Sequence, residues 1–111
     1  MPGHPKFFQL LEKMKEIHLA KNNDYAEDND PLSNLKMCTQ LNVPAYIGVL
    51  IRCSDKYARL IQLSKKEARV KDESFQDTLL DLANYCLLCY ILYDEEVLQS
   101  KIKYQKVEIH P

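Results

Sequence analysis

The segment that most constrains the fold is residues 73–90, ESFQDTLLDLANYCLLCY, which predicts a helix that is apolar on nearly every side. Asp77, Asp81 and Asn84 nevertheless lie inside this apolar segment. An ionised carboxylate that leaves water without a partner costs several kcal/mol or becomes protonated. Each carboxylate of the predicted helix therefore needs a partner from elsewhere in the chain.

Most of the remaining sequence also has apolar residues at helical spacing, and only two glycines occur in 111 residues. Asp30-Pro31 is typical of a helix start, and so is Asn42-Val43-Pro44. Polar segments predict a loop over 21–30 and a linker over 65–73. The sequence therefore predicts an all-α helical bundle with three long helices and one short helix, at about 5–22, 31–41, 44–64 and 74–99.

The chain has the length of a single domain, which we expect over residues 1–99, followed by a C-terminal tail over 100–111. Partial alternation of apolar residues in the tail leaves three alternatives open, which are a strand, an arm onto a partner and disorder. Helices this hydrophobic in so small a chain predict burial against a second copy. We expect a homodimer or a homotetramer that completes the bundle.

Charge and hydropathy narrow the classes of partner. Fifteen basic and sixteen acidic residues give a net charge of −1, so no overall field attracts nucleic acid or an anionic membrane. No apolar run approaches the roughly 20 residues that span a bilayer, and the N-terminus lacks the pattern of a signal peptide. We expect a cytoplasmic protein that binds neither nucleic acid nor membranes.

The four cysteines occur in apolar helical contexts, which predicts reduced core thiols rather than a disulfide framework. Cys86 and Cys89 form a C-x-x-C pattern. In the middle of a helix and without a second ligand pair, this pattern is only a weak indication of zinc or redox chemistry. The phosphate-binding loop, the nucleophile elbow of hydrolases and the H-E-x-x-H motif do not occur in the sequence.

The acidic residues of 73–90 fall on one helical face, because Glu73, Asp77 and Asp81 are four residues apart and Asn84 follows three residues later. A structural explanation suffices for the first two, since Glu73 lies at the helix N-terminus and Ser74-x-x-Asp77 resembles a capping box. Asp81 lies about two turns inside the helix, beyond the reach of any cap. Capping therefore does not explain Asp81, and a partner or a functional role has to.

Two interpretations of Asp81 remain open. One is a buried ion pair with Arg52, Lys56 or Arg59 of the preceding helix. The other is a site in which Asp55, Asp77 and Asp81 converge on a divalent cation, and oxygen ligands suit Mg²⁺ or Mn²⁺ better than zinc. A metal held by acids and surrounded by cations suits a polyphosphate, and the cations available are Lys21, Arg52, Lys56 and Arg59.

Four blocks of sequence, taken in order, resemble the phage and bacterial proteins of the nucleotide-modification-associated domain family. These are similar in turn to the MazG-like all-α NTP pyrophosphatases. The resemblance covers about residues 6–95. Its blocks are AKNNDYA (20–26), DPLSNLK (30–36), IRCSDKYARLIQL (51–63) and DESFQDTLLDLANY (72–85).

The resemblance implies an oligomeric helical bundle that hydrolyses a nucleoside triphosphate to the monophosphate and pyrophosphate with Mg²⁺. By position, it implies metal ligation by Asp55, Glu73, Asp77 and Asp81, with Asp55 and Asp81 as catalytic residues. It implies substrate contacts for Lys21, Asp24, Asn34 and Asn84, in addition to the cations Arg52, Lys56 and Arg59.

One departure from the superfamily pattern concerns the middle helix, where an E-x-x-E is usual and RCSDKYAR offers only Asp55. The last helix has acids four apart in place of the usual E-x-x-D. The leading hypothesis is a Mg²⁺-dependent nucleotide pyrophosphohydrolase of phage nucleotide metabolism. The alternative, from a different class, is a non-catalytic module that binds a nucleotide or another protein.

Overall fold

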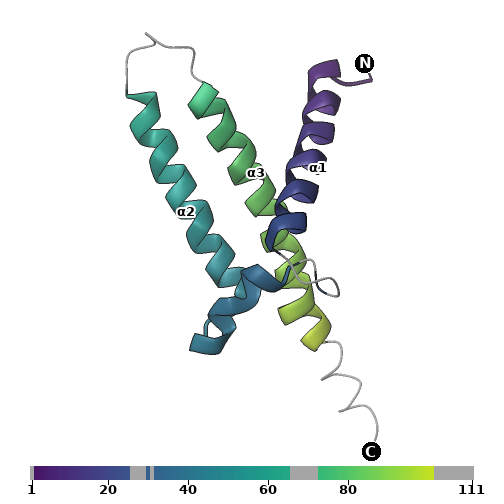
Figure 1. Cartoon of the computed structure of the whole chain (residues 1–111), viewed down its shortest axis with the longest axis vertical. Coiled ribbons are helices and arrows are strands. Elements are labelled where there is room, and N and C mark those ends of the chain that lie inside the picture. The colour runs from purple at the N-terminus through teal and green to yellow at the C-terminus, as the bar shows by residue number, and fades with distance from the viewer. Residues whose placement is uncertain (1, 26–29, 31, 66–72, 102–111) are drawn as a thin grey trace, which may run out of the picture. The chain divides into compact units, whose positions relative to one another are not determined.

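The computed structural model describes residues 2–25, 30, 32–65 and 73–101, with only the backbone described for 22–25, 73 and 74. Every element in these ranges is helical, which confirms the predicted all-α class with three long helices and one short helix (Figure 1). The chain divides into two compact units, Met1–Asn34 and Leu35–Pro111, and each is considered by itself. The oligomer that would complete a bundle stays a prediction.

The N-terminal unit contains α1, Pro5–Tyr25. The helix begins as its sequence predicts, with proline at the first helical position and His4 as the cap, because the His4 Nδ1 atom accepts a hydrogen bond from the Lys6 N–H at 3.0 Å. The predicted end at Asn22 is wrong by three residues. Asn and Asp cost a helix only about 0.7 kcal/mol each relative to alanine, so a polar run need not end one.

The short helix η1, Ser33–Leu41, is a 3₁₀ helix. It begins at the predicted signal, where the Asp30 Oδ1 atom accepts a hydrogen bond from the Leu32 N–H at 3.0 Å. Asn42 ends it in the left-handed backbone conformation, with φ of 63°. The sequence Asn42-Val43-Pro44 therefore separates two helices, and its asparagine terminates the first helix rather than capping the second.

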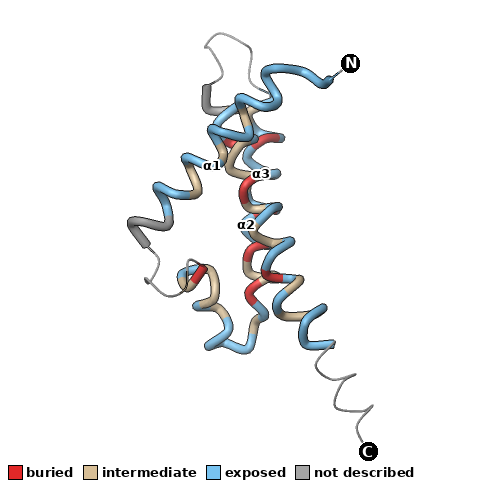
Figure 2. The backbone as a smooth tube through the Cα atoms, turned by 90° about the vertical axis from the view of Figure 1, so that its right-hand side faces the viewer, coloured by how far each residue is buried: buried red, intermediate tan, exposed pale blue. Residues whose placement is uncertain are grey.

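The second unit is dominated by a hairpin of α2, Ala45–Ser64, and α3, Glu73–Tyr93. Their directions are opposite, because Tyr46 packs edge-on against Tyr93 near one end and Lys56 pairs with Asp81 nearer the other. Residues 66–72, and with them most of the predicted linker, lie outside the described residues. Figures 1 and 2 show α2 and α3 side by side.

The two helices meet along a seam, a line of buried and half-buried side chains with alternating spacings of three and four residues. This spacing is typical of helices that pack along their lengths. On α2 the seam consists of Val49, Cys53, Lys56, Leu60 and Leu63, and on α3 of Thr78, Asp81, Tyr85, Leu88 and Leu92. Most of these positions are apolar, but Lys56 and Asp81 place one charged pair within the seam.

The first turn of α2 is capped by a residue that is distant in sequence. Its N-cap residue is Pro44, which offers no side-chain acceptor. The Glu96 carboxylate takes this role, because its two oxygens accept hydrogen bonds from the Ala45 N–H at 2.9 Å and the Tyr46 N–H at 2.7 Å. Glu96 lies in η2, Asp94–Leu98, a π-helical segment that continues α3.

None of the helices in the described ranges combines the length and the hydropathy that crossing a membrane would require.

Candidate functional site: a cationic cleft on the helix hairpin

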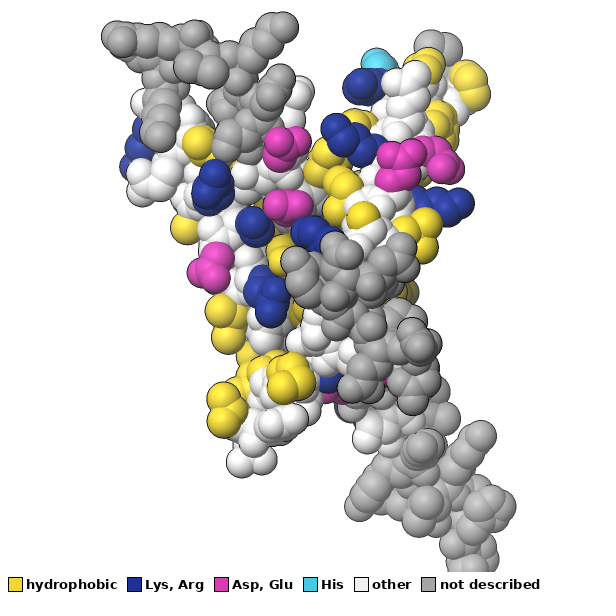
Figure 3. All heavy atoms as spheres, in the orientation of Figure 1, with side chains coloured by type: hydrophobic (Ala, Val, Ile, Leu, Met, Phe, Trp, Pro, Cys, Tyr) yellow, Lys and Arg dark blue, Asp and Glu magenta, His cyan; other side chains and the backbone are white. Residues whose placement is uncertain are grey.

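The candidate site lies on one face of α2, where charged residues recur at the spacing of successive helical turns. Arg52, Asp55, Lys56 and Arg59 are separated by three, one and three residues, which places their side chains on a single face. Together with Tyr85 of α3 they line a cleft of about 360 Å³. Figure 3 shows Lys and Arg side chains interleaved with Asp and Glu along this hairpin.

The charges that line the cleft are three cations and one carboxylate, so the cleft favours an anionic ligand. Two of the cations are arginines, whose planar guanidinium groups can donate two parallel hydrogen bonds to a phosphate. The Arg52 guanidinium carbon lies 5.9 Å from the centre of the Tyr85 ring, a cation–π contact that connects the two helices. This contact positions one arginine at the edge of the cleft.

Asp81 has the partner that the ion-pair interpretation requires, because the Lys56 Nζ atom lies 3.3 Å from the Asp81 Oδ2 atom. The two side chains retain 31% and 29% of their exposure, so the pair is partly shielded from water. The carboxylate therefore has a cationic partner at a seam position. This pair also connects the wall of the cleft to the seam, since Lys56 belongs to both.

The acidic residues predicted as metal ligands do not gather into one group in the described part of the chain. Asp55 lines the cleft and is exposed, Asp77 is exposed, and Asp81 is paired with Lys56. The Glu73 side chain lies outside the described residues. Among the side chains that are described, no three His, Cys, Asp or Glu residues are arranged to hold a metal ion.

Asn84 occupies a different environment from the one expected of a substrate contact. It is 9% exposed, and its Nδ2 atom donates a hydrogen bond to the Leu80 carbonyl oxygen at 3.2 Å. A residue three positions after Asp81 lies about 60° around the helix from it. This rotation is sufficient to bury the amide, and Asn84 is not among the residues that line the cleft.

The remaining predicted substrate contacts belong to the N-terminal unit. Lys21 and Asn34 are exposed there. The Asp24 side chain lies outside the described residues. Of the predicted set, the cleft on the second unit gathers Arg52, Asp55, Lys56 and Arg59.

Tyr85 is the cleft residue that the sequence reasoning did not assign to the site. It follows Asp81 by four residues, so the helical period alone places it one turn further on the same face. Its aromatic ring could have been recognised as a surface for a base or a guanidinium group.

Comparison with known proteins finds no family model, no curated protein and no solved structure that matches this chain.

Proposed function

We propose that this protein binds a nucleoside triphosphate in the cleft on α2, with the phosphate chain against Arg52, Lys56 and Arg59. The observation that carries the proposal is the presence of three cations and one aromatic ring around a single cleft. Cations on successive turns suit a chain of phosphates, because each turn of helix advances about 5.4 Å. The Tyr85 ring offers an apolar surface on which a base can stack.

We further propose that the bound triphosphate is hydrolysed to the monophosphate and pyrophosphate, as expected from the resemblance to the MazG-like NTP pyrophosphatases. A water molecule attacks the α-phosphorus, the bond to the bridging oxygen breaks, and pyrophosphate leaves with the electron pair. Asp55 is the carboxylate of the cleft that can accept the proton from this water and pass it to solvent. Arg52 and Arg59 neutralise the charge that develops on the leaving pyrophosphate.

The described carboxylates do not make a metal site on their own, so a Mg²⁺ ion held by the empty protein does not fit them. A Mg²⁺ or Mn²⁺ ion that arrives on the triphosphate has a different requirement, since such ions use phosphate oxygens, water and one or two carboxylates. Asp55 supplies one carboxylate in the cleft. The ion would there reduce the negative charge of the phosphates, and the substrate is proposed to be the metal–nucleotide complex.

The alternative function, a non-catalytic nucleotide-binding module, is favoured by a different observation. Asp81, one of the two residues expected to be catalytic, is paired with Lys56 at 3.3 Å, and no described group of three potential ligands surrounds it. A cleft of this kind can bind a polyphosphate without activating water. The two functions make the same prediction for affinity and different predictions for turnover.

The test is titration calorimetry with each of the common ribonucleoside and deoxyribonucleoside triphosphates in the presence of Mg²⁺, followed by measurement of released pyrophosphate. Arg59→Gln should weaken binding roughly tenfold, the equivalent of one charge-assisted hydrogen bond. The matched control is Lys65→Gln, which removes a charge just beyond the end of the same helix and outside the cleft. It should change the Kd less than about twofold.

Turnover distinguishes the two functions. In the hydrolase, Asp55→Asn should abolish pyrophosphate release and leave the Kd within a few-fold of wild type. Binding without pyrophosphate release by the wild type would instead establish the non-catalytic module. Failure of every triphosphate to bind, or equal effects of Arg59→Gln and Lys65→Gln, would refute the cleft as a nucleotide site.

A further inference from the structure

Three of the four cysteine thiols gather at the α2–α3 hairpin. Cys53 lies on α2, and the C-x-x-C pair Cys86 and Cys89 lies on α3. The pairing of Tyr46 with Tyr93 and of Lys56 with Asp81 sets the register of the hairpin, and this register places Cys53 opposite Cys86. In helix pairs of this type, a seam residue inserts between residues of the facing helix, so Cys53 faces the turn of α3 that contains Cys86.

The contacts of the thiols agree with this register. Cys53 lies between Tyr46 and Lys56 on α2, and Cys86 lies between Asp81 and Tyr93 on α3, so both thiols fall within the stretch that these two contacts align. The Cys89 Sγ atom donates to the Tyr46 carbonyl oxygen at 3.5 Å, so Cys89 is already engaged with the start of α2. All four cysteines are free thiols in this structure. Cys86 is therefore the α3 thiol that the register places beside Cys53.

The Cys53 and Cys86 thiols differ in their access to solvent. Cys53 is buried at 9% exposure, whereas Cys86 is exposed, contrary to the expectation that all four cysteines belong to the core. Burial, followed by the influence of the neighbouring Cys86 thiol, raises the pKa of Cys53 to about 11. A dissolved oxidant therefore meets Cys86 first, and Cys53 is a protected thiol at its side.

We infer that Cys53 and Cys86 form a reversible disulfide between α2 and α3 when a hydroperoxide reaches the exposed Cys86 thiol. In the first step the Cys86 sulfur attacks one oxygen of the peroxide and the O–O bond breaks. Cys86 becomes a sulfenic acid, and with hydrogen peroxide as the oxidant the other oxygen leaves as water. In the second step the Cys53 sulfur attacks the Cys86 sulfur, the S–OH bond breaks, and a second water leaves with the Cys53 proton. In total the two thiols lose two electrons, and one molecule of peroxide accepts them.

The position of this disulfide relates it to the cleft. Cys53 follows Arg52 and Cys86 follows Tyr85, and these two neighbours form the cation–π contact between the helices. A disulfide holds its two Cα atoms within about 7 Å, so its formation fixes the spacing of α2 and α3 directly beside the cleft. The thiol pair is defined by the hairpin alone and does not depend on which ligand the cleft takes.

The test uses the full-length protein, treated with increasing hydrogen peroxide, alkylated, and analysed by intact mass and by peptide mapping. The expected product is a monomer that has lost two hydrogen atoms and contains a Cys53–Cys86 link, which dithiothreitol reverses. Cys89→Ser should form the same link, and Cys38→Ser serves as the matched control for the remaining thiol. Cys53→Ser and Cys86→Ser should each abolish it.

Three results would overturn the inference. They are a Cys86–Cys89 link within α3, a Cys86–Cys86 link between two chains, and over-oxidation of Cys86 to the sulfinic acid while Cys53 remains alkylatable. Circular dichroism of each variant before oxidation establishes that it is folded. Cys86→Ser changes an exposed position and is expected to stay folded. It therefore still tests the link even if a variant at the buried Cys53 loses its helical signal.

Discussion

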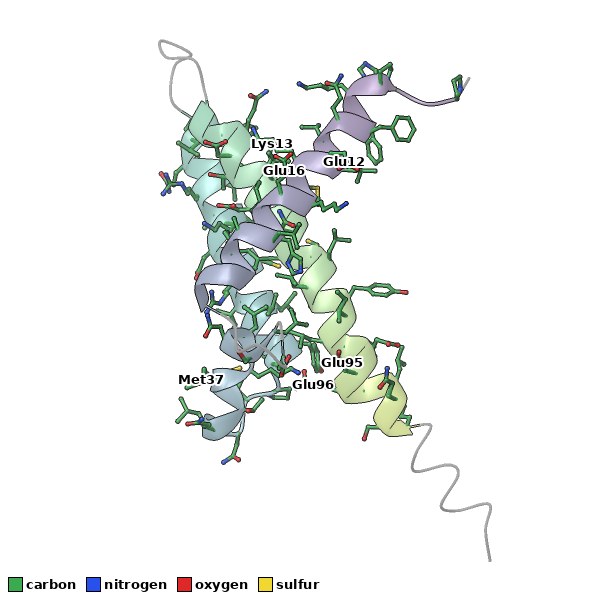
Figure 4. All side chains as sticks on the ribbon, turned by 45° about the vertical axis from the view of Figure 1, so that its right-hand side comes forward. Glu12, Lys13, Glu16, Met37, Glu95 and Glu96 are labelled. Atoms are coloured by element: carbon green, nitrogen blue, oxygen red, sulfur yellow. The ribbon has the colours of Figure 1, made fainter. Side chains whose placement is uncertain are left out.

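Removal of the Glu96 carboxylate should destabilise the hairpin more than removal of any other exposed or half-exposed charge in it. Glu96→Ala leaves the Ala45 and Tyr46 N–H groups at the start of α2 without their acceptors. Figure 4 shows Glu95 and Glu96 as neighbours that extend from the end of α3 toward the segment formed by η1 and the start of α2. Glu95 therefore offers a matched control within the same π-helical segment.

The magnitude follows from the two hydrogen bonds. A bond to a charged group contributes about 1.5–3 kcal/mol, and a buried donor that loses its acceptor suffers the full cost of desolvation. Ala45 is 0% exposed, so water cannot replace its acceptor, whereas Tyr46 is half-buried and can be partly hydrated. We expect Glu96→Ala to lower the free energy of unfolding by about 2–4 kcal/mol, a large part of the total for a domain of this size.

The control substitution acts on a weaker interaction. Glu95 pairs with Lys36 at 3.7 Å, and the two side chains are 42% and 35% exposed. Such surface pairs contribute between about 0 and 1 kcal/mol, so Glu95→Ala should cost no more than about 0.5 kcal/mol. Glu96→Gln retains one carbonyl acceptor without the charge and should lie between the two.

The assay is urea denaturation followed by circular dichroism. With a slope of about 1.5 kcal/mol per molar urea, the expected loss for Glu96→Ala lowers the midpoint by roughly 1–3 M. Equal effects of Glu95→Ala and Glu96→Ala would show that the π-helical segment matters as a whole rather than through this carboxylate. A loss below about 0.5 kcal/mol for Glu96→Ala would refute the capping explanation.

Three further predictions concern the same unit. Gly48→Ala builds a Cβ atom 2.7 Å from the Cys38 Sγ atom and should lower the free energy of unfolding by about 1 kcal/mol. In a Cys38→Ala background the same substitution should raise it by up to about 1 kcal/mol, since alanine is the better helix former. Additive effects in a double-mutant cycle measured by urea denaturation would contradict this. Asp81→Asn should lower the free energy of unfolding by about 1–2 kcal/mol, because it leaves the half-buried Lys56 charge without its partner. The double variant Lys56→Met/Asp81→Leu removes both charges and should lose much less, as judged by urea midpoints. Equal losses for the two variants would contradict this. Folding raises the pKa of Cys53 from 9.0 to about 11, so this thiol leaves the free energy of unfolding unchanged below pH 9 and lowers it by about 2 kcal/mol as the pH rises to 11. Cys53→Ala should lack this part of the decline. An equal decline of the free energy of unfolding with pH in the wild type and the variant would refute this.

The periodicity of apolar residues was sufficient to predict the helices, because each must bury one face whatever its partner is. It was less informative about which face is buried. Among the apolar residues of α2, Leu50, Tyr57 and Ile61 are exposed, whereas Val49 and Leu60 are buried. A stripe at a period of 3.6 residues is broad, and the position of α3 decides which half of it becomes the seam.

The candidate site was predictable in its charges and less so in its geometry. The helical spacing of Arg52, Lys56 and Arg59 places them on one face from sequence alone. The partner of Asp81 was not predictable, since three cations of the preceding helix were equally available and the register of the hairpin selects Lys56. The same register brings Tyr85 to the cleft.

The class of the fold, the starts of its helices and the cationic face of α2 follow from local sequence patterns, because they depend on residues within a few turns of one another. Interactions between segments distant in the chain depend instead on how the helices pack. Glu96 caps a helix that begins about fifty residues earlier, and the Cys53 thiol is opposite Cys86. Local patterns carry no information on which distant residue fills such a position, because the direction and register of two helices are set by the packing of the whole seam.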